Sequence, residues 1–506
     1  MLWRDTDSDG GGSVRQAPEC FGDLNLDQVV ATIIAGRDGY DLRPSFHAPL
    51  RDVDAVAYRH EVFADLQVPE LRQCVDTFAR AMRHVREQRV QAAALLDARQ
   101  RRRLHLDAAS TYYAAVEGFA RDLSDHHLDS RGLRAFGDYL RDHVGSAGFR
   151  EAHADAERVS HDLAALRYRL VLDQDGFTVF RDGGDDGAAL GLKETFARFE
   201  RKPSRQRLTK AVDDLAMNKL ESAIQERVAW LYPEAFAALD EFTRRRSDFI
   251  DAGVARFDRE VQFYLAYLDY VRYFERGGLA FCLPEVSSSE KSVEVRAAFD
   301  PALAYALIAN RRAVVPNDVV LSGRERLFVV TGANQGGKTT FARMFGQLHY
   351  LASLGCPIPG TRARLFLCDE VLTHFDKEED LEELRGKLQD ELMRIRGLLE
   401  RASPRSVVIM NEAFTSTTAH DALYLGRNVL GRLLELDALG VWVTFIDELA
   451  SLDPAVVSLV SGVDPEDSAR RTFELARRPA DGRAHAEAIA RAHRLTYAEL
   501  RERLAP

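Results

Sequence analysis

The sequence predicts a mostly helical part up to about residue 300, followed by an α/β part with a mostly parallel sheet. Two observations lead to this fold class. Up to Pro301 the chain contains few prolines and spaces its apolar residues three and four apart, as amphipathic helices do. Beyond Pro301, short apolar and β-branched runs alternate with helical patterns. Such alternation is typical of a parallel sheet covered by helices.

The composition is that of a folded chain. Of the 506 residues, 46% are hydrophobic and 29% are charged, which excludes an intrinsically disordered protein. The net charge of −11 argues against a protein that simply coats nucleic acid, although it leaves a local basic stripe open. The five cysteines lack metal-binding spacing, which is typical of free thiols in a reducing compartment.

Targeting signals are not recognisable in the sequence. No run of 18 apolar residues could form a transmembrane helix, so we expect no membrane partner. Residues 1–18 are acidic and rich in glycine, unlike a signal or transit peptide, and are expected to form a disordered tail. The expected location is therefore cytoplasmic.

Residues 19–300 are expected to form one helical domain. Residues 68–106 and 204–274 each carry a long helical pattern, and each could form one arm. Between them, Phe177–Leu192 reads as a short strand followed by a Gly/Asp turn, which is typical of a small hairpin. Two long arms joined at this element and a helical bundle folded back on itself fit the pattern equally well.

The α/β part is expected over residues 301–480, followed by a helical segment over residues 481–506. An amphipathic helix that packs on the sheet is expected at Glu378–Ala402, where leucines recur at helical spacing. The other expected helices are Thr339–Ser353 and His420–Leu439. The expected strands are Leu327–Thr331, Arg364–Cys368, Ser406–Met410 and Val441–Ile446.

A glycine-rich loop carries the clearest chemistry. Residues 332–339 fit the pattern G-x-x-x-x-G-K-[ST] directly after a predicted strand and directly before a predicted helix. In this context backbone N–H groups surround the phosphates of ATP, and the helix N-terminus adds partial positive charge. Lys338 would reach the β- and γ-phosphates, and the Thr339 hydroxyl would bind Mg²⁺. A glycine-rich turn with an incidental lysine is the alternative. The expected nucleotide-binding residues are Gly332, Ala333, Asn334, Gln335, Gly336, Gly337, Lys338, Thr339 and Thr340.

A second polar pair follows the predicted strand Ser406–Met410. Asn411 and Glu412 would lie at the carboxyl end of this strand, where open parallel sheets place their ligands. Glu412 is expected to polarise the attacking water and, with Lys338, to be catalytic. Asn411 stands where an aspartate usually supports the metal, so we expect slow, Mg²⁺-dependent ATP hydrolysis. The alternative is that the pair merely ends a buried strand.

These motifs resemble those of the MutS family of DNA mismatch-repair ATPases. The loop TGANQGGKTT is similar to the family's TGPNMGGKST, and it is followed by GCPIP at Gly355–Pro359. The segments VVIMNEAFTSTTAHDAL at Val407–Leu423 and FIDELASL at Phe445–Leu452 continue the match in the same order. Ser45–Leu66 resembles the start of the family's helical core domain. The resemblance implies a helical core and lever domain followed by a P-loop ATPase domain of the ABC type.

The resemblance also implies a homodimer with two ATP sites at the interface between ATPase domains. Residues 481–506 would help to clasp the partner subunit. ATP binding would move the helical arms, which close around DNA as a clamp in members of the family. The residues expected at the dimer interface are Glu412, Thr417, Thr418, Asp421 and Lys387, the last where the family has a Ser-Thr pair.

The sequence also departs from the family pattern. Core-like sequence begins by about residue 25, so we expect no counterpart of the family's mismatch-reading and connector domains and no mismatch recognition by this chain alone. Phe445 stands where the family has a histidine that senses the γ-phosphate. Asn317 and Asp318 are expected to flank the adenine. Because Val314 and Val315 replace the family's aromatic residue there, base stacking is unsupported.

Arginine clusters in the expected arms could meet DNA phosphates. Acidic residues are interleaved with them, so a solvated helix face is the alternative. His126 and His127 read as structural or solvated. The candidate DNA contacts are Arg99, Arg101, Arg102 and Arg103, with further clusters at Arg80, Arg83, Arg86, Arg89, Arg201, Lys202, Arg205, Arg207 and Arg244–Arg246.

Two functions are compatible with these patterns. The first is an ATP-driven DNA-binding clamp or sensor in DNA repair or recombination, which would be nucleoid-associated and could work with a repair-protein partner. The second is an ATP-gated scaffold whose arms bind a protein and have little DNA affinity.

Overall fold

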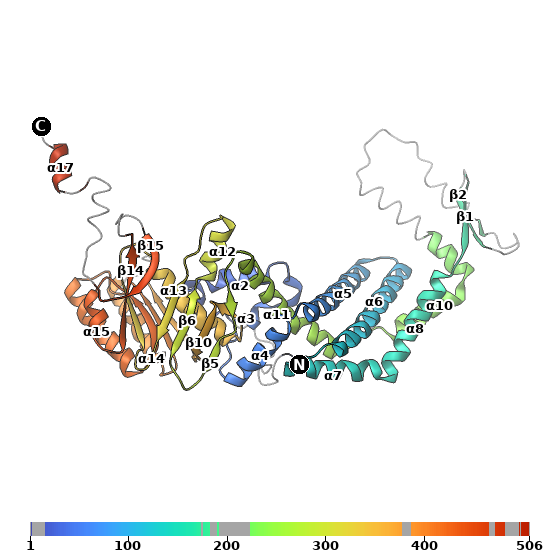
Figure 1. The fold of residues 1–506 in the computed structure, drawn as a ribbon. Coiled ribbons are helices and arrows are strands. Elements are labelled where there is room, and N and C mark those ends of the chain that lie inside the picture. The colour runs from blue at the N-terminus through green and yellow to red at the C-terminus, as the bar shows by residue number, and fades with distance from the viewer. Residues whose placement is uncertain are drawn as a thin grey trace. The chain divides into compact units, whose positions relative to one another are not determined.

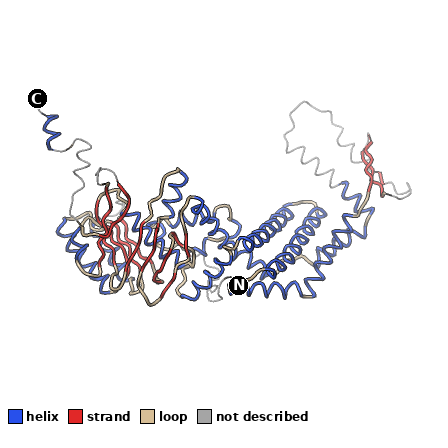
Figure 2. Tube along the Cα trace, viewed as in Figure 1, coloured by secondary structure: helices blue, strands red, loops and turns tan. Residues whose placement is uncertain are grey.

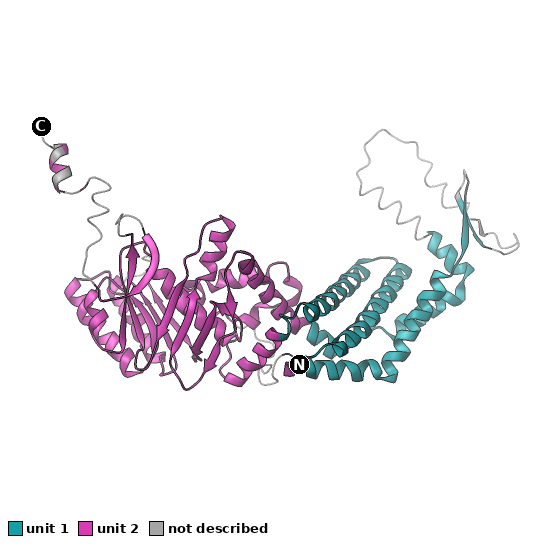
Figure 3. Cartoon of the chain, in the orientation of Figure 1, with its two compact units in different colours: residues 1, 65–129, 133–258 teal, residues 2–64, 130–132, 259–506 magenta. Residues whose placement is uncertain are grey.

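A computed structural model describes most of the chain in two compact units (Figure 3). The described residues are 2, 16–173, 176–182, 190–191, 223–376, 386–464, 471–480, 495 and 497–504. The helical unit comprises residues 1, 65–129 and 133–258, and the sheet unit comprises residues 2–64, 130–132 and 259–506. Residues 19–64 and 259–300 therefore group with the sheet rather than with the other helices. None of the described helices is long and apolar enough to cross a membrane.

The expected continuous helix over residues 68–106 is absent, and two helices take its place. Helix α5 (Pro69–Ala94) ends where Leu95 becomes extended, and α6 (Ala98–Asp125) begins after Asp97. The Asp97 side chain accepts hydrogen bonds from the N–H groups of Arg99 and Gln100, so it caps a new helix. Helices α5 and α6 then pack against each other (Figure 1).

The second expected arm, residues 204–274, is also interrupted where it is described. Residues 204–222 lie outside the described part of the chain. Beyond them, Pro233 starts helix α10 (Pro233–Arg245), and a turn separates α10 from α11 (Ala252–Arg276). Helix α10 packs against α6 and α8 (Ala147–Ala164), so the described helices fold back on one another. Helix α7 (Arg131–Gly145) precedes α8.

The hairpin expected at Phe177–Leu192 is confirmed over its described residues as the pair β2 (Gly176–Arg181) and β3 (Leu190–Gly191). A further strand, β1 (Tyr168–Asp173), pairs antiparallel with β2 and was not predicted. The element is therefore a small three-stranded antiparallel sheet, seen beside α10 in Figure 1.

The sheet unit contains a six-stranded sheet. All described strands are red in Figure 2. Neighbouring strands are parallel except for the last pair, which is antiparallel. Three of the strands were predicted within a few residues, and β11, β14 and β15 were not. In spatial order the strands are β11 (Val371–Phe375), β12 (Val407–Asn411), β13 (Leu439–Val443), β8 (Leu327–Gly332), β14 (Val456–Val463) and β15 (Arg471–Arg477).

The strand expected at Arg364–Cys368 belongs to another sheet, so its expected place in the parallel sheet was wrong. It forms β10 (Arg362–Phe366), which pairs antiparallel with β6 (Val293–Ala298). Arg362 and Arg364 are exposed while Ala363 is buried, so only one face of β10 is covered over these residues. The other strands of this sheet are β5 (Glu285–Ser287) and β7 (Asn317–Leu321).

Helices cover both faces of the six-stranded sheet. Phe328 on β8 packs against Phe341 and Phe345 of α13 (Lys338–Ser353). The flanking Leu327 and Val329 point to the opposite face, because successive strand residues alternate. There they join one apolar core with α14 (Lys387–Arg401) and α15 (Ala419–Glu435). The amphipathic helix expected at Glu378–Ala402 is thus confirmed from Lys387 onward, whereas residues 377–385 lie outside the described part.

Most of the expected N-terminal tail lies outside the described residues. Leu2 is buried, donates its N–H to Glu260 and accepts from the Tyr264 hydroxyl, so disorder is wrong at this residue. Of residues 481–506, only Leu495 and α17 (Tyr497–Leu504) are described. The remaining elements of the sheet unit are α1 (Cys20–Asp23), α2 (Leu26–Ile34), η2 (Asp38–Tyr40), α3 (Arg43–Phe46), α4 (Val53–Asp65), β4 (Phe281–Cys282), α12 (Pro301–Ala309), β9 (Ile358–Pro359) and η5 (Asp447–Ser451).

Candidate nucleotide-binding site

The glycine-rich loop joins the end of β8 to the start of α13, as its sequence predicts. Gly332 and Gly337 adopt left-handed backbone angles, with φ of +105° and +92°. A Cβ atom on Gly332 or on Gly336 would lie 2.6 Å from the Ser461 hydroxyl oxygen of β14. Glycine is therefore required at these positions, because any side chain would clash with the neighbouring strand. The loop passes close against β14 with its backbone.

Lys338 lies at the start of α13 and is only 4% exposed. Its Nζ donates to the Gly332 carbonyl (2.9 Å), the Ala333 carbonyl (3.2 Å) and the Asn334 amide oxygen (3.3 Å). All three of these acceptors are neutral. Burial lowers the pKa of Lys338; the nearby Glu412 carboxylate works against this shift and Arg471 adds to it. The loop thus holds a buried cation that an anion could stabilise.

Phe445 contacts this lysine. Its ring centroid lies 4.9 Å from Lys338 Nζ, within the range of a cation–π interaction. The ring is 52% exposed, so one part faces solvent while another faces the lysine. Phe445 therefore lies at the loop, at the position where the family has its histidine, but it has no group that could hydrogen-bond a phosphate.

The second polar pair lies at the carboxyl end of β12. Asn411 is 7% exposed, and its Oδ1 has no hydrogen-bond partner among the described residues. Glu412 donates its N–H to the Val443 carbonyl and adopts a left-handed backbone angle (φ +57°). Strands β12, β13 and β8 are parallel neighbours, so Asn411, Glu412 and the loop share one end of the sheet.

The residues present fit a magnesium ion. Mg²⁺ prefers oxygen ligands and usually keeps several waters. Thr339, directly after Lys338, is half-buried, and the buried Asn411 Oδ1 is an acceptor without a donor among the described residues. A bound water or ion would satisfy this buried acceptor.

Strand β15 brings two further residues to the loop that the sequence analysis missed. Arg471 Nε donates to the Asn334 carbonyl at 3.1 Å. Phe473 lies with its Cα and Cβ 3.9 Å from the position a Gly337 Cβ would take, and its side chain is 46% exposed. Both residues are far from the loop in sequence and belong to no recognised motif, so only the strand pairing reveals them.

Asn317 fixes the position of Phe473. Its Nδ2 donates to the Phe473 carbonyl at 3.1 Å, and its Oδ1 accepts from the Leu475 N–H at 2.8 Å. The neighbouring Asp318 instead accepts a hydrogen bond from the Ala297 N–H and pairs with Arg296, and these contacts lower the pKa of its carboxyl. Of the two residues expected near the adenine, Asn317 thus acts on β15, and Asp318 is occupied elsewhere.

The expected interface residues lie near the ends of α14 and α15. Thr418 caps α15 by accepting from the Asp421 N–H, and its hydroxyl donates to the Asp421 carboxylate. Thr417 is half-buried just before this cap. Lys387, at the start of α14, donates to the Asp376 carboxylate at 3.1 Å. These contacts do not test the expected role of the four residues at a dimer interface, which stays a prediction.

The candidate DNA contacts are largely engaged within the helical unit. Arg102 pairs with Asp240 at 2.8 Å, Arg103 pairs with Asp107, and Arg101 donates to the Leu96 carbonyl. The residue Arg99 is half-buried. The cluster Arg201, Lys202, Arg205 and Arg207 lies outside the described residues.

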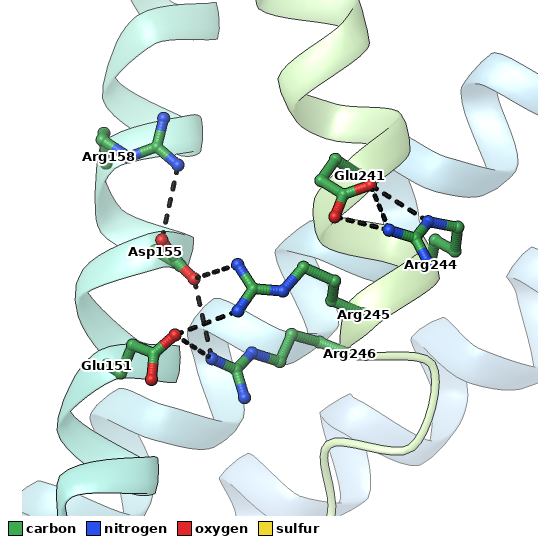
Figure 4. A network of polar contacts seen from close by, with 7 residues as sticks. All are labelled: Glu151, Asp155, Arg158, Glu241, Arg244, Arg245 and Arg246. Carbon is green, nitrogen blue, oxygen red and sulfur yellow. Dashed lines mark hydrogen bonds and ion pairs between the residues drawn. The ribbon is translucent and has the colours of Figure 1, made fainter.

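Figure 4 shows a further set of these arginines engaged with acidic residues. Arg245 and Arg246 both pair with Glu151 and Asp155 of α8, and Arg244 pairs with Glu241. The two histidines are also engaged: His126 with the Asp122 carbonyl, and His127 with Asp129. The interleaved acidic residues therefore neutralise these described arginines of the helical unit.

Comparison with known proteins assigns this region to one family model. Residues 328–473 match the model of MutS domain V. The DNA mismatch repair protein MutS of Syntrophomonas wolfei is 34% identical over 153 residues, which cover 30% of this chain and 18% of that protein. MSH3 of Kluyveromyces lactis is 28% identical over 148 residues (28% and 14%), and endonuclease MutS2 of Thermomicrobium roseum is 32% identical over 203 residues (39% and 25%). The matches thus span a quarter or less of these relatives' own lengths.

Proposed function

We propose that this chain, which belongs to the MutS family, is a Mg²⁺-dependent ATPase that couples ATP binding to DNA binding in repair or recombination. The observation that carries the proposal is the buried Lys338, whose hydrogen-bond acceptors in the described structure are neutral. Strand β12 ends in the polar pair Asn411 and Glu412 at the same end of the sheet. Such a cation, held by a glycine-rich loop at a helix N-terminus, suits the phosphates of a nucleotide.

Each group at the site takes one part in this proposal. Lys338 exchanges its carbonyl and amide acceptors for β- and γ-phosphate oxygens, and the loop N–H groups bind the same phosphates. Thr339 and Asn411 would hold Mg²⁺, which would supply positive charge to the phosphates when bound. Glu412 polarises the water that attacks the γ-phosphate. Asn411 carries no charge, so slow hydrolysis is expected.

The nucleotide base is placed by a different part of the sheet. Val314 and Val315 cannot stack on adenine, but the exposed ring of Phe473 lies next to Gly337. We infer that this ring supplies the flat face for the base and that Arg471 approaches the phosphates from the same strand. The aromatic contact then comes from β15 rather than from the segment before the loop.

Dimerisation and DNA binding complete the proposal. Thr417, Thr418, Asp421 and Lys387 would lie between the ATPase domains of a homodimer, and residues 481–506 would clasp the partner subunit. The helices of the helical unit would move with ATP and engage DNA. Mismatch recognition by this chain alone is not part of the proposal.

A second function is favoured by the ion pairs of the helical unit. Arginines that are already paired with Glu151, Asp155 and Asp240 have less to gain from DNA phosphates. A net charge of −11 works in the same direction. On this alternative, ATP gates a scaffold that binds a repair protein.

Steady-state ATP hydrolysis, measured alone and with duplex, mismatched, branched and single-stranded DNA, separates the two functions. A rate that changes with one DNA class and is lost in Lys338→Ala supports the DNA-coupled ATPase and names its substrate. A rate indifferent to every DNA supports the scaffold. No hydrolysis despite ATP binding would overturn the ATPase assignment and leave a nucleotide-binding switch.

A further inference from the structure

A buried histidine–glutamate pair lies one element away from the candidate catalytic residue. His374 on β11 and Glu391 on α14 both have side chains that are only 2% exposed. His374 Nε2 lies 3.3 Å from Glu391 Oε1 and donates to it when that nitrogen carries a proton. Neither residue belongs to the glycine-rich loop or to the polar pair after β12.

This pair is energetically costly to bury between a strand and a helix. Glu391 Oε2 is buried and has no hydrogen-bond partner among the described residues. Taking a carboxylate out of water is costly, and apolar side chains of similar size would often stabilise a core equally well or better. Packing alone therefore does not explain why a glutamate stands here.

Glu391 does make one contact of consequence outside the pair. Its Oε1 accepts a hydrogen bond of 2.8 Å from the Phe414 N–H, two residues after Glu412. Phe414 has a φ of +65° and Glu412 a φ of +57°. Two residues other than glycine thus adopt the left-handed conformation within three positions, which persists only where the surroundings enforce it.

Hydrogen bonds from two sides enforce this turn. The Glu412 N–H donates to the Val443 carbonyl on β13, and the Phe414 N–H donates to Glu391 on α14. A second set of contacts connects the same segments. The Asp376 carboxylate binds Lys387 of α14 and lies 3.5 Å from the Thr415 hydroxyl. Helix α14 therefore holds the segment that directly follows Glu412.

We propose that Glu391, oriented by His374, is a positioning residue for Glu412. By holding the Phe414 N–H it fixes the left-handed turn over residues 412–414, and this turn sets the direction of the Glu412 carboxylate. Glu391 itself does not touch the nucleotide. The inference rests on the proposed ATPase function, and it predicts a loss in the rate of hydrolysis without a loss in ATP binding.

The test compares three variants in steady-state hydrolysis and in ATP binding. In Glu391→Met the acceptor is lost, and we expect kcat to fall by about 10- to 100-fold with KM and Kd for ATP within about twofold, as for a misdirected catalytic group. Glu391→Gln keeps an acceptor at Oε1 and should lose less than about threefold. The control is Glu400→Met, on the exposed face of the same helix, where Glu400 pairs with Arg396; it should match the wild type.

A double variant separates positioning from general damage. Adding Glu391→Met to Glu412→Gln should cause no further loss, because the turn no longer has a catalytic carboxylate to direct. A further loss of tenfold, or an unchanged kcat in Glu391→Met, would overturn the proposal. If Glu391→Met does not fold, His374→Leu replaces it in the test. This variant keeps the Glu391 acceptor but removes the histidine that orients it. A kcat of His374→Leu equal to that of the wild type would also overturn the proposal.

Hydrogen exchange tests the role of Glu391 independently of the proposed ATPase function. In the full chain without nucleotide, Glu391→Met should speed deuterium uptake in a peptide that contains residues 412–418, while Glu400→Met should not. Unchanged uptake would overturn the role of Glu391 even if the wild type hydrolyses ATP. If Glu391→Met speeds uptake but the protein neither binds nor hydrolyses ATP, Glu391 does support the turn, and the proposed ATPase function is refuted.

Discussion

Lys338 of the sheet unit and the ion-paired arginines of the helical unit have different kinds of partners. In the helical unit, Arg102, Arg245 and Arg246 pair with carboxylates on neighbouring helices (Figure 4). In the sheet unit, Lys338 is buried and donates to two carbonyls and an amide oxygen. The number of basic residues in a region is therefore a poor guide to phosphate binding, whereas the partners of each cation are informative.

The paired arginines and the buried Lys338 differ in how much a phosphate would stabilise them. An exposed ion pair contributes little and is screened by salt, so replacing its carboxylate with a DNA phosphate gains little. A buried cation whose hydrogen-bond acceptors are all neutral has lost its hydration without gaining a direct ion pair. A nucleotide phosphate restores that balance at Lys338, and this difference makes the loop the stronger candidate site.

The largest expected effect concerns catalysis at the loop end of the sheet. Glu412→Gln should lower the rate of ATP hydrolysis by about 10³-fold, because a positioned general base contributes on this scale. ATP should still bind, so single-turnover rates and equilibrium binding are measured on the same sample. Hydrolysis at the wild-type rate would mean that Glu412 is not the base.

Lys338→Ala should raise the Kd for ATP by about 100-fold, since hydrogen bonds to charged groups are the strong ones. The matched control is Lys291→Ala: Lys291 also donates to carbonyls but is already paired with Asp437 at 2.7 Å. Its removal should leave the Kd within about twofold of the wild type. Equal losses in the two variants would break the comparison between paired and unpaired cations.

Phe473→Ala should weaken ATP binding about tenfold, the scale of one base stacked on an aromatic ring. Binding of tripolyphosphate, which has no base, should be unchanged, and calorimetry with both ligands measures the difference. Trp230→Ala serves as the control, since Trp230 is also an exposed aromatic residue but belongs to the helical unit. Weaker tripolyphosphate binding in Phe473→Ala would show that the loop itself was disturbed.

Asn411→Asp should lower the Mg²⁺ concentration needed for half-maximal hydrolysis by about threefold, because a carboxylate binds this ion and its waters more strongly than an amide. The measurement is a Mg²⁺ titration at saturating ATP. An unchanged midpoint would place the metal away from β12.

The smallest effects are expected in the helical unit. Arg102→Ala should change the affinity for duplex DNA by less than about twofold, because Asp240 already neutralises this arginine. Asp240→Ala should strengthen binding by about twofold at low salt, since it releases Arg102 for a phosphate. Fluorescence anisotropy across a salt series measures both. A loss of DNA binding in Arg102→Ala would show that the paired arginines are the DNA surface after all.

The sequence predicted the loop well because its information is local. Residues 332–339 form one contiguous pattern between a strand and a helix, and the structure joins β8 to α13 there. Asn411 and Glu412 were found for the same reason, since they follow a run of four apolar residues. Local patterns also predicted α13, α15 and the strands β8, β12 and β13 within a few residues.

Contacts between distant segments could not be predicted from such patterns. Asp97 ended a helix that periodicity alone would continue, because its side chain caps the next one. Phe473 and Arg471 reach the loop only through the pairing of β15 with β14, whose register shifts between Ser461 and Val463. Glu391 looked like one more polar residue on an amphipathic helix, and only its burial against His374 distinguishes it.

Equilibrium titration of the full wild-type chain with ATP and Mg²⁺ tests the central claim most directly. We predict one ATP per chain with a Kd below about 1 mM, the usual range for enzyme substrates. The same titration of Lys338→Ala should show no saturation in that range. A wild type that does not saturate, or a Lys338→Ala protein that binds ATP as tightly as the wild type, would contradict the assignment of this loop as the nucleotide site.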